Sequence, residues 1–97
     1  MKGIEYLKFL VDTDDPTIEF FEAMIHTFET GCQKHGRKWL DWAYMDWNIE
    51  VRIEYEAKLI GHFAQAMRSD SAADKCKHLA AVACNACILW YHAKKEK

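Results

Sequence analysis

The stretch "ADKCKHLAAVACNACILWYHA", residues 73–93, decides the fold, because its apolar residues recur at helical spacing with no proline or glycine among them. The predicted core face of this helix comprises Leu79, Val82, Ala83, Ala86, Leu89, Trp90 and Ala93. A polar line of Asp74, His78, Asn85 and His92 runs along one margin of that face, at spacings of four, seven and seven residues. Polar groups at such a margin point into the groove between helices, where bundle proteins build metal and ligand sites.

Three members of this polar line also have a simpler interpretation. Ser71 and Asp74 have the spacing of a capping box, which by itself accounts for Asp74. Asn85 is explained equally well by a hydrogen bond across a subunit interface, and His92 by solvation near the chain end. The line therefore predicts either a functional site or an interface.

The rest of the chain is also predicted to be helical, because it has one proline, four glycines and no alternating β-branched runs. We expect a short helix over about residues 3–11 and a second helix from Pro16 to about residue 34. A third helix starts after a cap at Asp46 or Asn48 and runs to about residue 68, and a fourth runs from Ser71 to about residue 95. Residues 1–97 thus form one all-α domain, a small bundle of about four helices. So short a chain has little surplus stability, so we expect it to assemble as a dimer.

The third expected helix, which ends at about residue 68, carries a carboxylate in its predicted apolar stripe. The stripe comprises Ile49, Ile53, Ile60, Phe63 and Met67. Glu56 falls inside it and Arg52 at its edge, whereas Glu54 and His62 lie away from it. An inward carboxylate is costly unless it is paired or binds a cation. Three explanations stay open: an Arg52–Glu56 pair at the rim of the core, a Mg²⁺ ligand, or a subunit contact.

Charge and hydropathy narrow the possible partners and compartment. A formal net charge of −2 predicts no general attraction to nucleic acid, although Lys34, Arg37 and Lys38 form a local basic spot. Trp39 and Trp42, in the aromatic segment that follows, suit either a base-stacking pocket or a core. No apolar run is long enough for a membrane span, and acidic residues follow the N-terminus too closely for a signal peptide. We expect a cytoplasmic protein with reduced cysteines.

Three segments together carry a family resemblance. "GCQKHGRKW", "IEYEAKLIGHF" and "SDSAADKCKHLAAVACNACIL" follow one another within about residues 20–92. In this order they resemble the small all-α nucleoside triphosphate pyrophosphohydrolases, namely the MazG-like proteins and the phage-type dATP/dGTP diphosphohydrolase-like proteins. The matching pieces are Lys34–His35–Gly36 with Trp39, then His62, then Asp74 with His78–Leu79, and finally Asn85–Ala86.

The resemblance implies a Mg²⁺-dependent enzyme that cleaves a nucleoside triphosphate to the monophosphate and pyrophosphate. It also implies a homodimer or a dimer of dimers. Such chemistry needs charge neutralisation and positioning, which a few carboxylates around Mg²⁺ supply.

The roles implied for individual residues divide into three groups. Metal ligands would be Glu54, Glu56, Asp70 and Asp74. His78 and Asn85 would act in catalysis by orienting water or phosphate. Substrate would be bound by Lys34, His35, Arg37, Trp39, Trp42 and His62.

The chain departs from the family in its acidic residues. The MazG hallmark is E-E-x-x-E on one helix and E-x-x-D on the next, whereas this chain has only Glu54 and Glu56 followed by Asp70 and Asp74. The alternative prediction is therefore a non-catalytic helical binding or assembly module that kept the fold and lost the chemistry.

Overall fold

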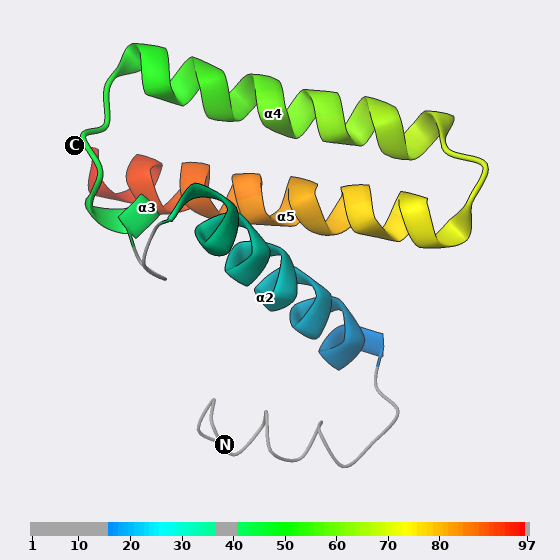
Figure 1. Ribbon diagram of the computed structural model, residues 1–97. Helices are drawn as coiled ribbons and strands as arrows, with labels where there is room; N and C mark the ends of the chain where they lie inside the picture. The colour runs from blue at the N-terminus through cyan, green and yellow to red at the C-terminus, as the bar shows by residue number, and fades with distance from the viewer. Residues whose placement is uncertain (1–15, 37–40, 97) are drawn as a thin grey trace.

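The computed structural model describes residues 16–36 and 41–96, and this part of the chain is all-helical, with no strand (Figure 1). The helices are α2 (Pro16–His35), α3 (Asp41–Tyr44), α4 (Ile49–Arg68) and α5 (Ala72–Lys95). The predicted all-α fold is confirmed, and so are the bounds of the three long helices to within a few residues. The helix expected over residues 3–11, and with it the full extent of a 1–97 domain, lies outside the described residues. No described helix combines the length and apolar character needed to cross a membrane.

Helices α4 and α5 begin at side-chain caps: Asn48, one of the two caps predicted for α4, and Ser71, predicted for α5. The Asn48 side chain accepts a hydrogen bond from the Val51 N–H at 3.0 Å and so starts α4. Ser71 does the same for α5, accepting from the Asp74 N–H at 3.3 Å. Each cap satisfies a backbone donor that has no partner within the helix, which fixes where the helix begins.

Helix α5 is the centre of the described fold (Figure 1). Helix α4 runs antiparallel beside it, joined to it by the short turn at residues 69–71, and α2 crosses α5 from another side. The thiol of Cys84 on α5 lies 3.3 Å from the carbonyl oxygen of Met24 on α2, which marks this crossing. Among the described helices α4 packs on α5 alone, so much of its surface faces away from the bundle.

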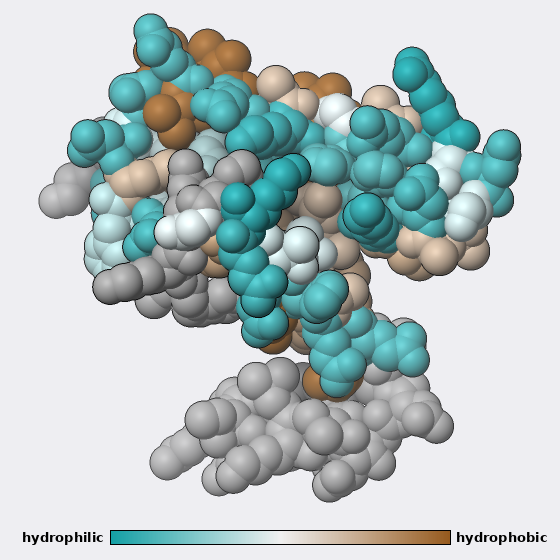
Figure 2. Space-filling view, viewed as in Figure 1, coloured by the Kyte–Doolittle hydropathy of each residue, from teal (hydrophilic) through white to brown (hydrophobic). Residues whose placement is uncertain are grey.

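The predicted core stripe of α4 is wrong. Its five members are 49–65% exposed, and Figure 2 shows hydrophobic atoms on the outer side of this helix. The face that packs on α5 comprises instead Val51, Tyr55, Leu59, His62 and Ala66, all half-buried or buried. Helix α4 has two apolar faces, and its contact with α5 covers the one with the smaller side chains and fewer isoleucines.

The predicted core face of α5 is also rotated from the observed one. Trp90 is 63% exposed, and Ala86 and Ala93 are exposed as well. The buried residues of this helix are Ala80, Cys84, Asn85, Ile88 and His92. Because α5 has neighbours on more than one side, part of its polar line lies inside the fold rather than at a margin.

Candidate functional site

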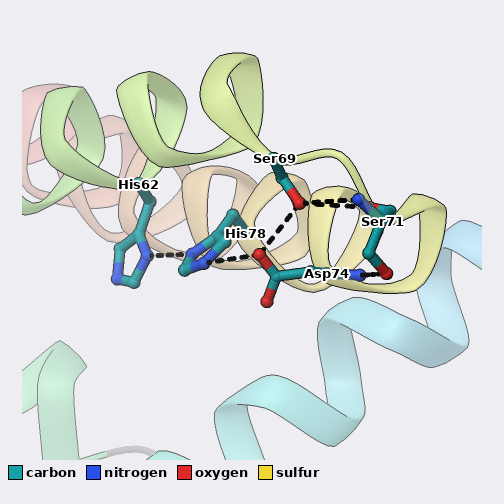
Figure 3. A network of polar contacts seen from close by, with 5 residues as sticks. All are labelled: His62, Ser69, Ser71, Asp74 and His78. Atoms are coloured by element: carbon teal, nitrogen blue, oxygen red, sulfur yellow. Dashed lines mark hydrogen bonds and ion pairs between the residues drawn. The ribbon is translucent and has the colours of Figure 1, made fainter.

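A histidine pair joins α4 to α5 (Figure 3). His62 on α4 and His78 on α5 place their Nδ1 atoms 3.0 Å apart, with the ring centroids 5.3 Å apart and the planes tilted by 34°. As a hydrogen bond, this contact requires a proton on one Nδ1 and a lone pair on the other. At most one proton therefore fits between the two rings.

Asp74 orients one ring of this pair. Its Oδ2 atom lies 3.6 Å from Nε2 of His78, one helical turn away, and 3.0 Å from the Ser69 hydroxyl, which donates to it. A carboxylate beside Nε2 favours the proton on that nitrogen, which directs the lone pair of Nδ1 toward His62. The same Ser69 oxygen accepts a hydrogen bond from the Ser71 N–H at 3.3 Å, so the turn between the helices holds the carboxylate in place.

The electrostatic surroundings keep His62 neutral. The pKa of His62 is lowered from its usual value of 6.5, mainly by burial and further by its neighbours His78, Lys58 and Lys77. A neutral imidazole at pH 7 has one ring nitrogen with a free lone pair. The pair therefore combines a site for a proton or a cation with a carboxylate behind it.

A second polar contact lies near the C-terminal end of α5. His92, only 4% exposed, has its Nε2 2.8 Å from the carbonyl oxygen of Trp42. Its ring stacks on Trp47 with centroids 4.0 Å apart and planes 3° apart. Trp47 stacks in turn on Tyr55 of α4, at 5.9 Å. His92 is thus an internal link between α5 and the segment before α4, not a solvated residue near the chain end.

The acidic residues expected to hold a metal do not meet one another. Glu56 pairs with Arg52 at 3.5 Å and Glu54 pairs with Lys58 at 3.2 Å, both on the exposed surface of α4. Asp70 is exposed in the turn after α4, and Asp74 belongs to the histidine pair. Within residues 16–36 and 41–96, no group of three or more His, Cys, Asp or Glu side chains is placed to hold a metal ion. The Mg²⁺ site remains a prediction.

The other predicted site residues are dispersed. Asn85 is buried and its Nδ2 donates to the Ala81 carbonyl oxygen of its own helix at 2.9 Å. Trp42 stacks on Phe28 at 5.7 Å and meets Tyr91 edge-on at 5.4 Å, so neighbouring rings already contact it. Lys34 is exposed near the end of α2, and His35 is the last residue of that helix. Arg37 and Trp39 lie outside the described residues.

A shallow groove lies between α4 and the C-terminal part of α5. Its volume is about 290 Å³, and Trp47, Arg52, Glu56 and Leu89 contribute to its walls. An aromatic ring, a guanidinium and a carboxylate thus converge beside an apolar wall. The groove does not contain the histidine pair.

The contact between His62 and His78 was not predicted from the sequence, although both were named as site residues. His62 lies off the predicted core stripe of α4, so that stripe did not place it against α5. The missed signal is a second stripe, in which Val51, Tyr55, Leu59, His62 and Ala66 recur at spacings of three or four residues.

Comparison with known proteins finds no matching family model, no similar curated protein and no similar solved structure. The function of this chain is therefore inferred from its own residues and their contacts. Two features stand out: the histidine pair, and the exposed apolar face of α4.

Proposed function

We propose that this protein is a helical assembly module that binds a second copy of itself through the outer face of α4. The observation that carries the proposal is the exposure of Ile49, Ile53, Ile60, Phe63 and Met67, which are 62%, 54%, 65%, 49% and 55% exposed. Full burial of one such side chain contributes about 1.5–3 kcal/mol. Five of them on one exposed helix face favour an interface over a solvated surface.

The spacing of this outer face suits a partner helix. Its positions, 49, 53, 56, 60, 63 and 67, follow one another at intervals of four and three residues, which is the pattern of a coiled-coil seam. In an antiparallel pair of α4 helices, Ile49 of one copy lies opposite Met67 of the other, and Ile53 lies opposite Phe63. Every apolar residue of the seam then lies opposite an apolar residue, except near the centre, where Ile60 of one copy lies opposite Glu56 of the other.

Charges beside the seam favour the antiparallel orientation. Glu50 and Arg68 lie on one flank of the seam at opposite ends of α4, with the small residues Ala57, Gly61 and Ala64 between them. An antiparallel second copy brings Glu50 of one chain near Arg68 of the other, twice in each dimer. A parallel copy would instead bring like charges together. Small side chains at these positions would allow the two backbones to approach closely, and the space beside Gly61 is open within one chain, since a Cβ added there would meet no atom within 4 Å.

The test is sedimentation equilibrium of the full chain across a wide concentration range. We expect Ile53→Asp and Ile60→Asp each to weaken association about 100-fold or more, because each places a charge in the seam. Gln65→Asp, an exposed position of α4 off the seam, is the matched control and should leave the dissociation constant unchanged. A chain that stays monomeric at millimolar concentration, or a dimer that tolerates both seam variants, would exclude this function.

A charge swap tests the orientation. Glu50→Arg alone should weaken association by repelling Arg68 of the second copy. The double variant Glu50→Arg with Arg68→Glu should restore it. A double variant that stays as weak as the single one would contradict the antiparallel arrangement.

We propose nucleotide pyrophosphohydrolysis as the second candidate, and the groove lined by Trp47, Arg52 and Glu56 favours it. The Arg52 guanidinium suits a phosphate and Glu56 would be a Mg²⁺ ligand, whereas Trp47, which already stacks on His92 and Tyr55, forms one wall of the groove. In the antiparallel dimer the Glu56 carboxylates of the two copies approach the two-fold axis, which would raise the number of acidic groups there. This function, like the first, fits a cytoplasmic protein, and the four cysteines, all within the described residues, form no disulfide with one another.

A panel of nucleoside triphosphates with Mg²⁺, assayed for pyrophosphate and for orthophosphate, tests this candidate. Pyrophosphate release that is lost in Glu56→Gln and retained in Asp74→Asn, a position outside the groove, would support it. Absence of release with every nucleotide, together with an unchanged melting temperature, would leave the assembly function alone.

A further inference from the structure

The two facing nitrogens of His62 and His78 are arranged as a metal chelate would need them. Both side chains are half-buried, they come from different helices, and their Nδ1 atoms are 3.0 Å apart. Two nitrogens bound tetrahedrally to one zinc ion, at about 2.0–2.1 Å each, lie roughly 3.3 Å apart. Such an ion would lie beside the line that joins the two nitrogens, so a few tenths of an ångström of added separation, a turn of both rings toward the ion and loss of the shared proton from Nδ1 would accommodate it.

We propose that His62 and His78 bind one divalent transition-metal ion, zinc being the simplest case, through their Nδ1 atoms. Water completes the coordination, because the described chain contributes two ligands here rather than three. The ion bridges α4 and α5 within one chain. This site is independent of the dimer face, which lies on the outer side of α4, and of the Mg²⁺ expected at Glu56.

Asp74 is the positioning residue of this site. Its carboxylate lies beside Nε2 of His78, the nitrogen that faces away from the ion, and Ser69 donates a hydrogen bond to the same oxygen. A carboxylate behind a ligating histidine fixes the tautomer and makes the imidazole a stronger ligand. Its negative charge also offsets Lys58 and Lys77, which lie near His62 and disfavour a bound cation.

The chemistry of the donors selects the ion. Neutral imidazole nitrogens prefer Zn²⁺, Cu²⁺ and Ni²⁺, whereas Mg²⁺ prefers oxygen. Because the ligands lie on two helices, binding stabilises the folded chain and raises its melting temperature.

The first experiment titrates Zn²⁺ into the full chain with a reducing agent present, by calorimetry and by thermal melting. We expect one ion per chain and a melting temperature about 5 °C higher at saturating metal. His62→Ala and His78→Ala should each weaken binding at least tenfold, and Asp74→Asn should weaken it about tenfold. His26→Ala is the matched control, because His26 is exposed on α2 and lies outside the pair, so it should bind as the wild type does.

The second experiment needs no variant and therefore does not depend on whether a variant folds. Long-range proton–nitrogen NMR on the wild-type chain resolves the imidazole nitrogens. Addition of Zn²⁺ should shift the Nδ1 resonances of His62 and His78 and leave those of His26 in place. Unshifted Nδ1 resonances, or full Zn²⁺ binding retained in His62→Ala and His78→Ala, would overturn the proposal and identify the contact as a shared proton alone.

Discussion

Helices α4 and α5 distribute their side chains in opposite ways. Helix α5 buries polar groups, namely Asn85 and His92, and exposes Trp90. Helix α4 exposes isoleucines at three positions and covers a face that contains His62. The difference follows the number of neighbours, since α5 contacts α4, α2 and α3, whereas α4 contacts α5 alone among the described helices.

A helix surrounded by neighbours must satisfy its polar groups internally. Asn85 donates to its own helix, and the ring nitrogen of His92 meets the Trp42 carbonyl. These bonds reduce the cost of burying polar groups. A helix with one neighbour covers one face and leaves the other to solvent or to another chain. In the proposed assembly, the outer apolar face of α4 is the one that a second copy covers.

The largest predicted effect compares the same residue type in the two helices. Ile88→Ala on α5 should lower the free energy of unfolding by about 2–4 kcal/mol, because Ile88 is 6% exposed and its loss leaves a cavity. Ile60→Ala on α4 should change it by less than about 0.5 kcal/mol, because Ile60 is 65% exposed. Chemical denaturation at concentrations below dimer formation measures both. Equal losses at the two positions would mean that the outer face of α4 is covered within the monomer.

A smaller effect is expected at the centre of the α4 seam. Glu56→Leu should strengthen self-association about tenfold, because it removes a carboxylate that loses water in the dimer and adds apolar area. Glu54→Leu is the matched control, since Glu54 also forms an exposed ion pair on α4 but lies off the seam. Sedimentation equilibrium compares the two variants. An equal gain from both would indicate nonspecific adhesion rather than a defined seam.

The smallest predicted effect is a pH dependence of stability that arises from His62, which lies between α4 and α5. The pKa of His62 is below 6.5 in the folded chain and near 6.5 in the unfolded chain. The unfolded chain therefore takes up the proton first as pH falls. The contribution of neutral His62 to the free energy of unfolding is complete above pH 6.5 and is lost as pH falls below it. Burial lowers the pKa of His62 most, and the neighbouring His78, Lys58 and Lys77 lower it further.

Thermal melts in EDTA between pH 7.5 and 5.5 check this prediction. The melting temperature of the wild type should fall by a few degrees more than that of His62→Ala, and His26→Ala should follow the wild type. Identical pH profiles for the wild type and His62→Ala would show that His62 takes up its proton equally in the folded and unfolded states.

The candidate site was only partly predictable from the sequence. Asp74 and His78 are one turn apart on one helix, so their contact is local and the polar line identified it. The partner of His78 comes from another helix, 16 residues earlier in the chain, and depends on which face of α4 turns inward. The ion pair of Arg52 with Glu56, one of three explanations left open, is again a local contact of one helical turn.

The sequence by itself determined that the described chain is helical and where its long helices begin, because caps such as Asn48 and Ser71 act within three residues of themselves. Only the tertiary structure decided which faces are covered. Helix α4 carries two apolar stripes with the same periodicity, and periodicity shows that a stripe exists without showing what covers it. That choice depends on contacts between residues far apart in the chain, and it places His62 against His78 and leaves the isoleucines of α4 exposed.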